Sequence, residues 1–199
     1  MRAIRRFLPF LLLMPLGAVP VQAQSWWAVT YAPSVPLSNT KTFADNASWR
    51  GINVEYKKAI KENVTAGLSF GWHVFDEQTD EVVSAFGVDI SGDQFRYVNA
   101  FPMLLNVSYF LGKTGGIRPF IGADAGVYIM EHRLDVGLYT IHETNAHIGF
   151  APEAGFAIPV RPNMSLLVTG RYNYALSAGN VDDQQYLNFG VGFAWNQGF

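Results

Sequence analysis

Charge is scarce in this 199-residue chain, and cysteine is absent. Charged residues make up 15% of the sequence, whereas about 25% is usual in a soluble domain. Without cysteine there is no disulfide framework, no thiolate chemistry and no lipid-modified cysteine. Beyond the N-terminal segment there is also no apolar run of the length, roughly eighteen residues or more, that a membrane-spanning helix needs. A surface so poor in charge needs an explanation other than an ordinary soluble fold.

The N-terminal segment has the features of a secretory signal peptide. It begins with three basic residues, Arg2, Arg5 and Arg6. An apolar core follows from residue 7 to about residue 19, and the small-residue pattern VQA ends at Ala23. An anchor helix is the rival interpretation, but the apolar stretch is too short for a bilayer and contains two prolines. We therefore expect a signal peptide over residues 1–23 and one barrel domain over 24–199.

Removal of residues 1–23 takes away three arginines and no acidic residue, so the formal charge falls from −2 to −5. A net negative chain without a basic patch argues against a nucleic-acid partner.

Alternation of apolar and polar residues predicts eight strands in the mature chain. They are expected near residues 25–33, 48–60, 63–75, 97–110, 118–132, 145–159, 164–175 and 185–199. Each is about as long as the roughly nine to eleven residues that cross a bilayer as a tilted strand. The links alternate between tight turns, at 61–63, 112–116 and 161–163, and longer, mostly acidic segments. This layout predicts an all-β, eight-stranded antiparallel up-and-down transmembrane barrel with short periplasmic turns and long extracellular loops.

The two faces of the strands differ in character. In the third strand, for example, Leu68, Phe70 and Trp72 lie on one face and Ser69 and Gly71 on the other. An eight-stranded barrel has room inside only for packed side chains, so the small and polar face is expected inside and the large apolar face outside, against lipid. A soluble lipocalin-like ligand-binding barrel is the alternative, and it would need the inverted pattern.

The sequence resembles the small outer-membrane β-barrel domain family of Gram-negative bacteria, of the OmpX/OmpA-barrel type. The resemblance rests on four segments, SWRGINVEYKKAIKENVTAGLSFGWHVF, RPFIGADAGVYI, APEAGFAIPVRPNMSLLVTGRYNYAL and FGVGFAWNQGF. It implies a monomer in the cell outer membrane, in contact with outer-membrane lipid and lipopolysaccharide. It also implies that the barrel-assembly machinery reads the aromatic C-terminal strand through Phe193, Trp195 and Phe199.

Five charged residues on four strands are predicted to point into the lumen: Glu55, Lys57, Asp124, Glu153 and Arg171. Buried charges persist only when they are paired, so we expect one network that plugs the barrel. A proton relay, an ion relay or a gate is the functional alternative. His73 and His147 are also expected inside, as hydrogen-bonded filling side chains.

Catalytic apparatus is not visible in the sequence. The His-x-Ser pattern of outer-membrane lipid A deacylases does not occur, and Ser69 and His73 would lie about 13 Å apart along one strand face. We therefore predict a structural or surface-interaction role with no catalysis and no cofactor. An outer-membrane lipid-modifying enzyme and a narrow small-solute channel remain the alternatives.

The segment EHRLDVGLYTIHE looks like a metal-binding hairpin, but strand parity argues against it. Inward residues are even-numbered in the fifth strand and odd-numbered in the sixth, so His132 can pair with Glu143 and not with His142. We predict no metal site there.

The second long link is acidic, with Asp76, Glu77, Asp80, Glu81, Asp89 and Asp93. It could bind divalent cations or a surface ligand, or it could be a loop kept in solution by its charge.

Two prolines fall within predicted strands, Pro102 in the fourth and Pro152 in the sixth. Proline has no N–H to donate and a closed barrel has no free edge, so a bulge or a local break is expected at each.

Overall fold

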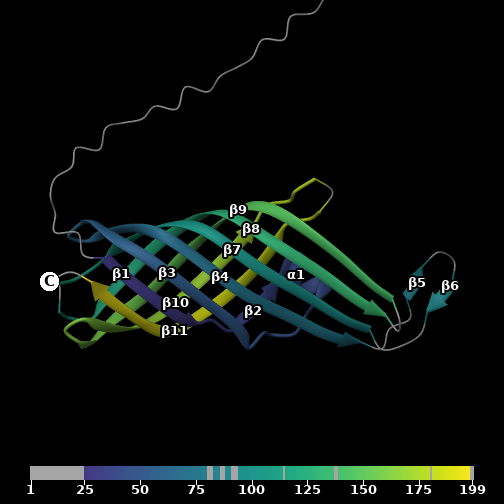
Figure 1. Ribbon diagram of the computed structural model, residues 1–199, viewed down its shortest axis with the longest axis horizontal. Helices are drawn as coiled ribbons and strands as arrows, with labels where there is room; N and C mark the ends of the chain where they lie inside the picture. Colours follow the sequence, from purple (N-terminus) through teal and green to yellow (C-terminus); the bar gives the residue numbers. More distant parts are fainter. Residues whose placement is uncertain are drawn as a thin grey trace, which may run out of the picture.

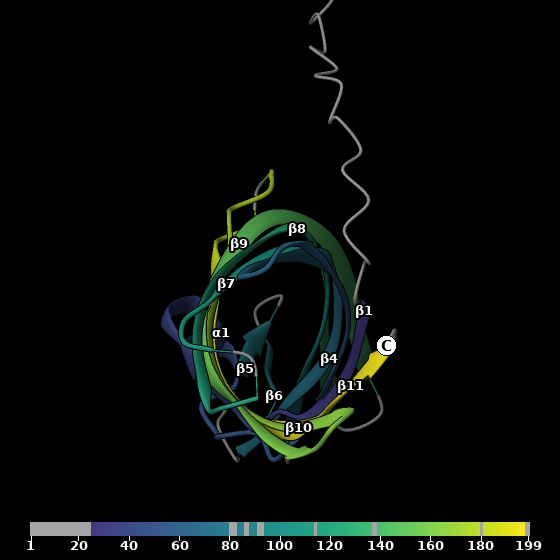
Figure 2. The ribbon, with the colours of Figure 1, turned by 90° about the vertical axis from the view of Figure 1, so that its left-hand side faces the viewer.

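The computed structural model describes residues 25–79, 83–85, 88–90, 94–113, 115–136, 139–179 and 181–197. Eight strands form the barrel wall: β1 (Ser25–Tyr31), β3 (Arg50–Lys61), β4 (Val64–Thr79), β7 (Gln94–Phe110), β8 (Arg118–Val136), β9 (Tyr139–Arg161), β10 (Met164–Ala175) and β11 (Gln184–Gln197). Each is antiparallel to the next, and β11 pairs back onto β1, which closes the ring seen in Figures 1 and 2. The predicted eight-stranded antiparallel barrel is confirmed.

Four short elements lie outside these eight strands. β2 (Ser34–Leu37) pairs with β11 beyond the end of β1, so it continues the first strand after a break. The six-residue helix α1 (Ser38–Phe43) follows it, and β5 (Val83–Ala85) and β6 (Val88–Ile90) form a separate hairpin between β4 and β7. Within the described residues, no helix has the length and apolar character to cross a membrane.

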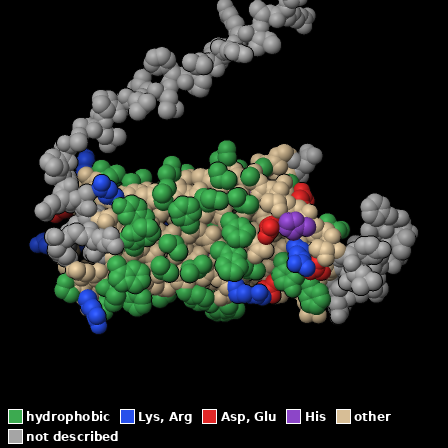
Figure 3. Space-filling model, in the orientation of Figure 1, with side chains coloured by type: hydrophobic (Ala, Val, Ile, Leu, Met, Phe, Trp, Pro, Cys, Tyr) green, Lys and Arg blue, Asp and Glu red, His purple; other side chains and the backbone are tan. Residues whose placement is uncertain are grey.

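The side-chain faces are arranged as the alternation predicts. On β4, Phe70 and Trp72 are 48% and 50% exposed, while Ser69 and His73, on either side of this pair in the sequence, are buried. The same alternation holds around the ring, and apolar side chains cover the middle of the wall while charged side chains gather near the two ends (Figure 3). The barrel therefore shows its apolar surface to the outside, which is the opposite of a lipocalin-like barrel.

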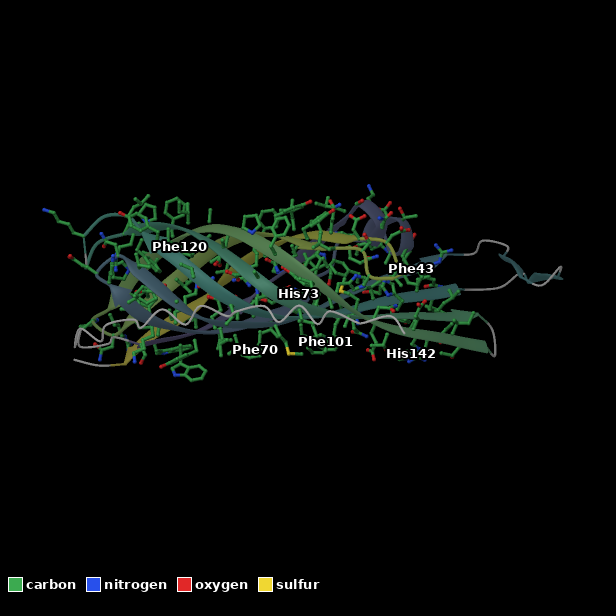
Figure 4. The ribbon with its side chains drawn as sticks, turned by 90° about the horizontal axis from the view of Figure 1, so that it is seen from above. Phe43, Phe70, His73, Phe101, Phe120 and His142 are labelled. Carbon is green, nitrogen blue, oxygen red and sulfur yellow. The ribbon has the colours of Figure 1, made fainter. Side chains whose placement is uncertain are left out.

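The lumen is filled in layers. At the end with the tight turns, hereafter the turn end, an apolar cluster contains Trp26, Ala28, Phe110, Phe120, Ala157, Leu167 and Ala194. Toward the opposite end, hereafter the loop end, a second cluster contains Phe75, Val98, Ala100, Leu104, Tyr128, Met130, Ala151, Ala175 and Tyr186 with Ala44. Figure 4 shows Phe120 toward the turn end, His73 near mid-height and Phe43 toward the loop end.

Each proline interrupts the pairing with one of its two neighbouring strands, and no β-bulge forms at either position. Around Pro102 the β4–β7 pairing passes from Phe70–Met103 to His73–Ala100 in unchanged register, while Pro102 still pairs with β8. Around Pro152 the β9–β10 pairing shows the same two-residue gap. The missing N–H removes hydrogen bonds toward one neighbour only, so the expected local break is found and the strand continues.

The loop end extends further than the alternation predicts. β4, β7, β8 and β9 continue together past the rest of the wall, as their length in Figure 1 shows. The segment 133–144, expected to hold a long loop, is mostly paired, and the β8–β9 ladder runs to Val136–Tyr139. The prediction of a long loop at this position is therefore wrong. Charged and apolar residues alternate along the segment, which allows a regular hairpin.

Candidate functional site

Five charged side chains meet in the middle of the lumen. Glu55 and Lys57 come from β3, Asp124 from β8, Glu153 from β9 and Arg171 from β10, and all five are buried. Alternation along each strand turns them inward, and the register places Arg171 directly opposite Glu153. The structure thus brings together the five residues grouped from the sequence, and we call them the charge layer.

Arg171 lies at the centre of the charge layer. Its Nη2 contacts the Glu55 carboxylate and lies 3.2 Å from both Asp124 Oδ2 and Glu153 Oε1. Its Nη1 donates to Ser69 Oγ over 2.9 Å. The planar guanidinium can serve several acceptors at once, which a lysine ammonium at this position could not match in geometry. One side chain therefore joins strands from opposite parts of the ring.

Lys57 supplies the second positive charge. Its Nζ lies 2.8 Å from Glu55 Oε2 and 3.6 Å from Glu153 Oε2, and it donates to Ser108 Oγ over 3.2 Å. It also lies 5.4 Å from the centroid of the Phe120 ring, at the boundary with the turn-end cluster. Two cations thus face three carboxylates, and polar and aromatic neighbours complete their environment.

Among the described residues, the side chains that lie close enough together to bind a metal ion are the three carboxylates of the charge layer. Oxygens of Glu55, Asp124 and Glu153 lie within 4.8 Å of one another, and such oxygens are ligands for hard divalent cations. Here, however, they already face the Arg171 guanidinium and the Lys57 ammonium. A metal ion would meet two fixed positive charges, so this donor set favours an internal salt-bridge network over a metal centre.

A buried serine and histidine form a second polar cluster that the sequence analysis did not identify. Ser34 Oγ lies 3.2 Å from His73 Nδ1, and the Asn53 and Asn188 side chains lie 3.1 Å and 3.3 Å from His73 Nε2. Serine beside histidine is the geometry of nucleophile activation. Both side chains are fully buried, however, so a substrate carbonyl has no path to the hydroxyl. Ser34 lies in a segment expected to be a loop, where strand parity gives no signal.

Several buried polar atoms near the loop-end cluster have no protein hydrogen-bond partner among the described residues. They are His147 Nε2, Asn173 Nδ2, Tyr186 Oη and Asn188 Oδ1. The other ring nitrogen of His147, Nδ1, lies 2.8 Å from the Leu176 carbonyl oxygen. This half of the lumen therefore has spare hydrogen-bonding capacity.

The loop end contains an open cleft of about 370 Å³ between α1, the β8–β9 hairpin and the segment before β11. Its lining residues are Asn39, Thr42, Phe43, His132, Glu143, Val181, Asp182 and Gln184. His132 pairs with Glu143 across the β8–β9 ladder, as parity predicts, and packs edge-on against Phe43 at 5.1 Å between ring centroids. Segments that are far apart in the sequence thus line one cleft at the loop end. Two of the lining side chains, Glu143 and Asp182, are carboxylates.

His132 lies beyond the apolar wall, since the outward residues beside it, Glu131 and Arg133, are charged. Burial lowers the pKa of His132 below its ordinary value, while the nearby Glu143 acts in the opposite direction. The imidazole is therefore neutral at pH 7. On the outer face, His142 Nε2 lies 3.2 Å from Glu131 Oε1, so the two histidines of the hairpin have separate carboxylate neighbours.

The acidic second link is only partly described. Asp76 and Glu77 lie in β4, where Asp76 forms a 2.9 Å ion pair with Arg50 and Glu77 accepts from the Asp45 backbone N–H over 2.8 Å. Asp89 falls in β6. Asp80, Glu81 and Asp93 lie outside the described residues.

Comparison with known proteins identifies the family. The sequence model of the outer membrane protein beta-barrel domain matches residues 10–196. The chain belongs to this family. It is therefore an outer-membrane protein whose apolar wall faces lipid, and the soluble alternative is excluded.

Solved structures show the same fold at low sequence identity. OprG from Pseudomonas aeruginosa is 13% identical with a TM-score of 0.59, over 89% of this chain and 97% of that one. Neisserial surface protein A is 14% identical with a TM-score of 0.54, over 88% and 97%. Ail of Yersinia pestis, in complex with the heparin analogue sucrose octasulfate, is 12% identical with a TM-score of 0.54, over 89% and 100%. A sequence comparison with curated proteins finds no match.

Two of the residues implied in assembly lie on the lipid-facing side of this outer-membrane barrel. Phe193 and Trp195 are each 42% exposed on β11, with their rings 6.5 Å apart. Phe199 lies outside the described residues.

Proposed function

We propose that this outer-membrane protein is a closed, non-catalytic barrel that acts through its loop end, as a surface-interaction or structural component of the membrane. In this proposal residues 1–23 are removed as a signal peptide and residues 24–199 form the mature barrel. The observation that carries the proposal is the filled lumen beneath an open, acidic loop end.

The filling of the lumen supports a plugged barrel. Apolar clusters lie on both sides of the charge layer, and the space among Trp26, Glu55, Lys57 and Phe120 amounts to about 10 Å³. A cavity of that size holds about one water molecule. A continuous water column, which a channel or an ion relay needs, has no room beside these side chains.

The absence of catalysis is proposed on the same basis. The charge layer is closed by its own ion pairs, and the Ser34–His73 pair is buried in the wall of the lumen. General acid–base or nucleophilic chemistry requires these groups to reach a substrate. The charge layer and the Ser34–His73 pair are buried, so neither supports the outer-membrane lipid-modifying alternative.

The charge of the loop end indicates the kind of surface partner. The loop-end segments contain four basic residues, Lys41, Arg50, Arg96 and Arg133, against twelve acidic ones, Asp45, Asp76, Glu77, Asp80, Glu81, Asp89, Asp93, Glu131, Asp135, Glu143, Asp182 and Asp183. Such a field attracts cations and repels polyanions. We therefore propose a cationic partner, or divalent cations shared with lipopolysaccharide. A sulfated ligand such as the one bound by Ail does not suit this surface.

Assembly is proposed to follow the family route, in which the barrel-assembly machinery reads the aromatic residues Phe193, Trp195 and Phe199. The outward exposure of the first two leaves them available for such contact.

Planar-bilayer conductance tests the plugged lumen. The refolded mature protein is expected to insert and give no stable conductance steps at high salt, as judged against an open porin under the same conditions. Regular steps that depend on Arg171 or Lys57 would contradict the proposal and favour the channel alternative.

Binding of a fluorescent tetralysine peptide tests the loop-end function. We expect binding to the barrel in zwitterionic vesicles, weakened by up to about fivefold for each carboxylate removed in Glu143→Gln and Asp182→Asn. Glu62→Gln, in a tight turn, is the matched control and should leave binding unchanged. Equal binding by all variants would contradict a cationic partner at this cleft.

A further inference from the structure

The turn end of the barrel is basic, in contrast to the loop end. Four exposed bases come from all three tight turns: Lys58 and Lys61 beside the β3–β4 turn, Lys113 between β7 and β8, and Arg161 at the end of β9. We call these four residues the basic collar. In the described part of these turns, Glu62 is the one acidic residue. No ion pair of a collar residue is found among the described residues.

On the lipid-facing wall, aromatic side chains lie next to the basic collar, on its side toward the loop end. Trp27 pairs with Tyr56 on one side and with Trp195 on the other, and the Trp27 and Tyr56 rings are 5.0 Å apart. Tryptophan and tyrosine gather at the headgroup level of a bilayer. Lys58 is two residues beyond Tyr56 on the same strand face, which places it about 6.6 Å closer to the turn end.

Exposed apolar residues accompany the bases in the same turns. They are Ile60, Leu111, Ile117 and Val160. Apolar side chains at this height favour the interface over water, and lysine and arginine can lay their stems along apolar surface while their charged groups reach the phosphates. The basic collar is therefore held at headgroup depth by its neighbours.

We propose that the basic collar binds anionic phospholipid headgroups of the periplasmic leaflet. Short turns of such barrels are periplasmic, and this is the leaflet that contains phospholipids. Each lysine or arginine close to an anionic bilayer surface strengthens association by about fivefold. The collar thereby fixes the depth and tilt of the barrel in the membrane from its turn end. The acidic loop end, in contrast, repels anionic lipids. This role is independent of what the loop end binds.

Tryptophan quenching by brominated lipid can test the two ends separately. One background protein carries Trp49→Phe and Trp72→Phe, so that Trp27 and Trp195 report on the turn end. The other carries Trp27→Phe and Trp195→Phe, so that Trp49 and Trp72 report on the loop end. Trp26 packs inside the lumen and is common to both. Each protein is refolded into phosphatidylcholine bilayers with brominated phosphatidylglycerol, or with brominated phosphatidylcholine as reference.

We expect the turn-end reporters to show at least about fivefold preference for phosphatidylglycerol, and the loop-end reporters to show none. Neutralising the collar with Lys58→Gln, Lys61→Gln, Lys113→Gln and Arg161→Gln should abolish the preference, as should high salt. The charge-matched control, Lys41→Gln, Arg50→Gln, Arg96→Gln and Arg133→Gln at the loop end, should retain it.

Three results would overturn the proposal. The first is equal quenching by the two lipids at the turn end, and the second is a preference that survives neutralisation of the collar. The third is binding of solubilised peptidoglycan fragments by the collar without any lipid preference, which would assign the bases to a soluble polyanion. The gel-mobility shift on heating shows that each variant is folded before its lipids are compared.

Discussion

At the residue scale, Arg171 is the side chain on which most other charges depend. It faces carboxylates from β3, β8 and β9, and all of these side chains are buried. Charges in such a place are tolerable because they are paired, and removal of one partner leaves the others unpaired. The net contribution of the intact network is smaller than the cost of breaking it.

Arg171→Met is therefore expected to destabilise the barrel by about 3–5 kcal/mol. Urea titration of the protein in lipid vesicles, followed by tryptophan fluorescence, measures the free energy of unfolding. Arg161→Met removes an exposed base of the same kind from a turn and is the matched control in zwitterionic vesicles, where the basic collar has no anionic lipid to bind, with an expected change within about 0.5 kcal/mol. Equal effects of the two substitutions would show that the charge layer is not a coupled network.

His132 provides a pH prediction for the loop end. Its folded pKa is lowered by burial, with Glu143 opposing this effect and His147 adding to it. Below the ordinary histidine pKa of about 6.5 the unfolded imidazole takes up a proton that the folded one resists. The stabilising contribution is thus complete above that value and is lost as the pH falls below it.

The expected observation is opening of the α1–hairpin cleft between about pH 6.5 and pH 5, seen as lower protection factors for amide exchange in α1, after correction for the intrinsic pH dependence of exchange. His132→Gln should remove the pH dependence, whereas His142→Gln, on the outer face, should keep it. Unchanged protection factors in the native protein over this range would contradict the burial of a neutral imidazole.

At the element scale, the closing pair β1–β11 depends on close backbone approach. A Cβ atom at Gly192 would come 2.0 Å from the Val29 carbonyl oxygen, so only glycine fits at this seam. A Cβ atom added at Gly170, on β10, would meet none of the described neighbours within 4 Å. The two glycines thus differ in what a side chain would meet.

Gly192→Val is expected to prevent closure or to cost about 3 kcal/mol or more, because overpacking against backbone cannot relax easily. Gly170→Val should fold normally and is its control. The heat-dependent gel shift and urea titration read out both variants. A normally folded Gly192→Val protein would show that the seam is looser than the register indicates.

Strand parity explains how much of these elements could be predicted from sequence. Inward and outward faces follow from a period of two, so the eight strands, the charge layer and the His132–Glu143 pair could be anticipated. β2 and α1 could not, because four and six residues are too few for a periodic signal. The Ser34–His73 contact depends on β2, and it was missed for the same reason.

The extended β8–β9 hairpin was missed for a different reason. Its charged residues suggested a solvated loop, yet Arg133 and Asp135 alternate with Leu134 and Val136. Above the membrane a strand can carry charge on its outer face, so low apolar content does not end the ladder there. In the sequence analysis, the predicted strands end where the lipid-facing apolar residues end. The β8–β9 backbone pairing continues beyond that point.

At the scale of the whole molecule, three features act together: an apolar wall, a lumen filled in layers, and ends of opposite charge. The wall places the barrel in the membrane, the filling supports the proposal of a closed lumen, and the opposite charges of the ends support the proposal of different partners for the two surfaces. In the proposed function, partners bind at the loop end, and the basic collar is proposed to anchor the turn end.

The most direct test of this account is a nitroxide scan of β7. The chain has no native cysteine, so single cysteines can be placed at residues 103–108 without other changes. We predict that positions 103, 105 and 107 are accessible to oxygen dissolved in lipid, and that positions 104, 106 and 108 are shielded both from oxygen and from a water-soluble nickel reagent. Access of the nickel reagent to the even-numbered positions would reveal a water-filled lumen and contradict the closed barrel.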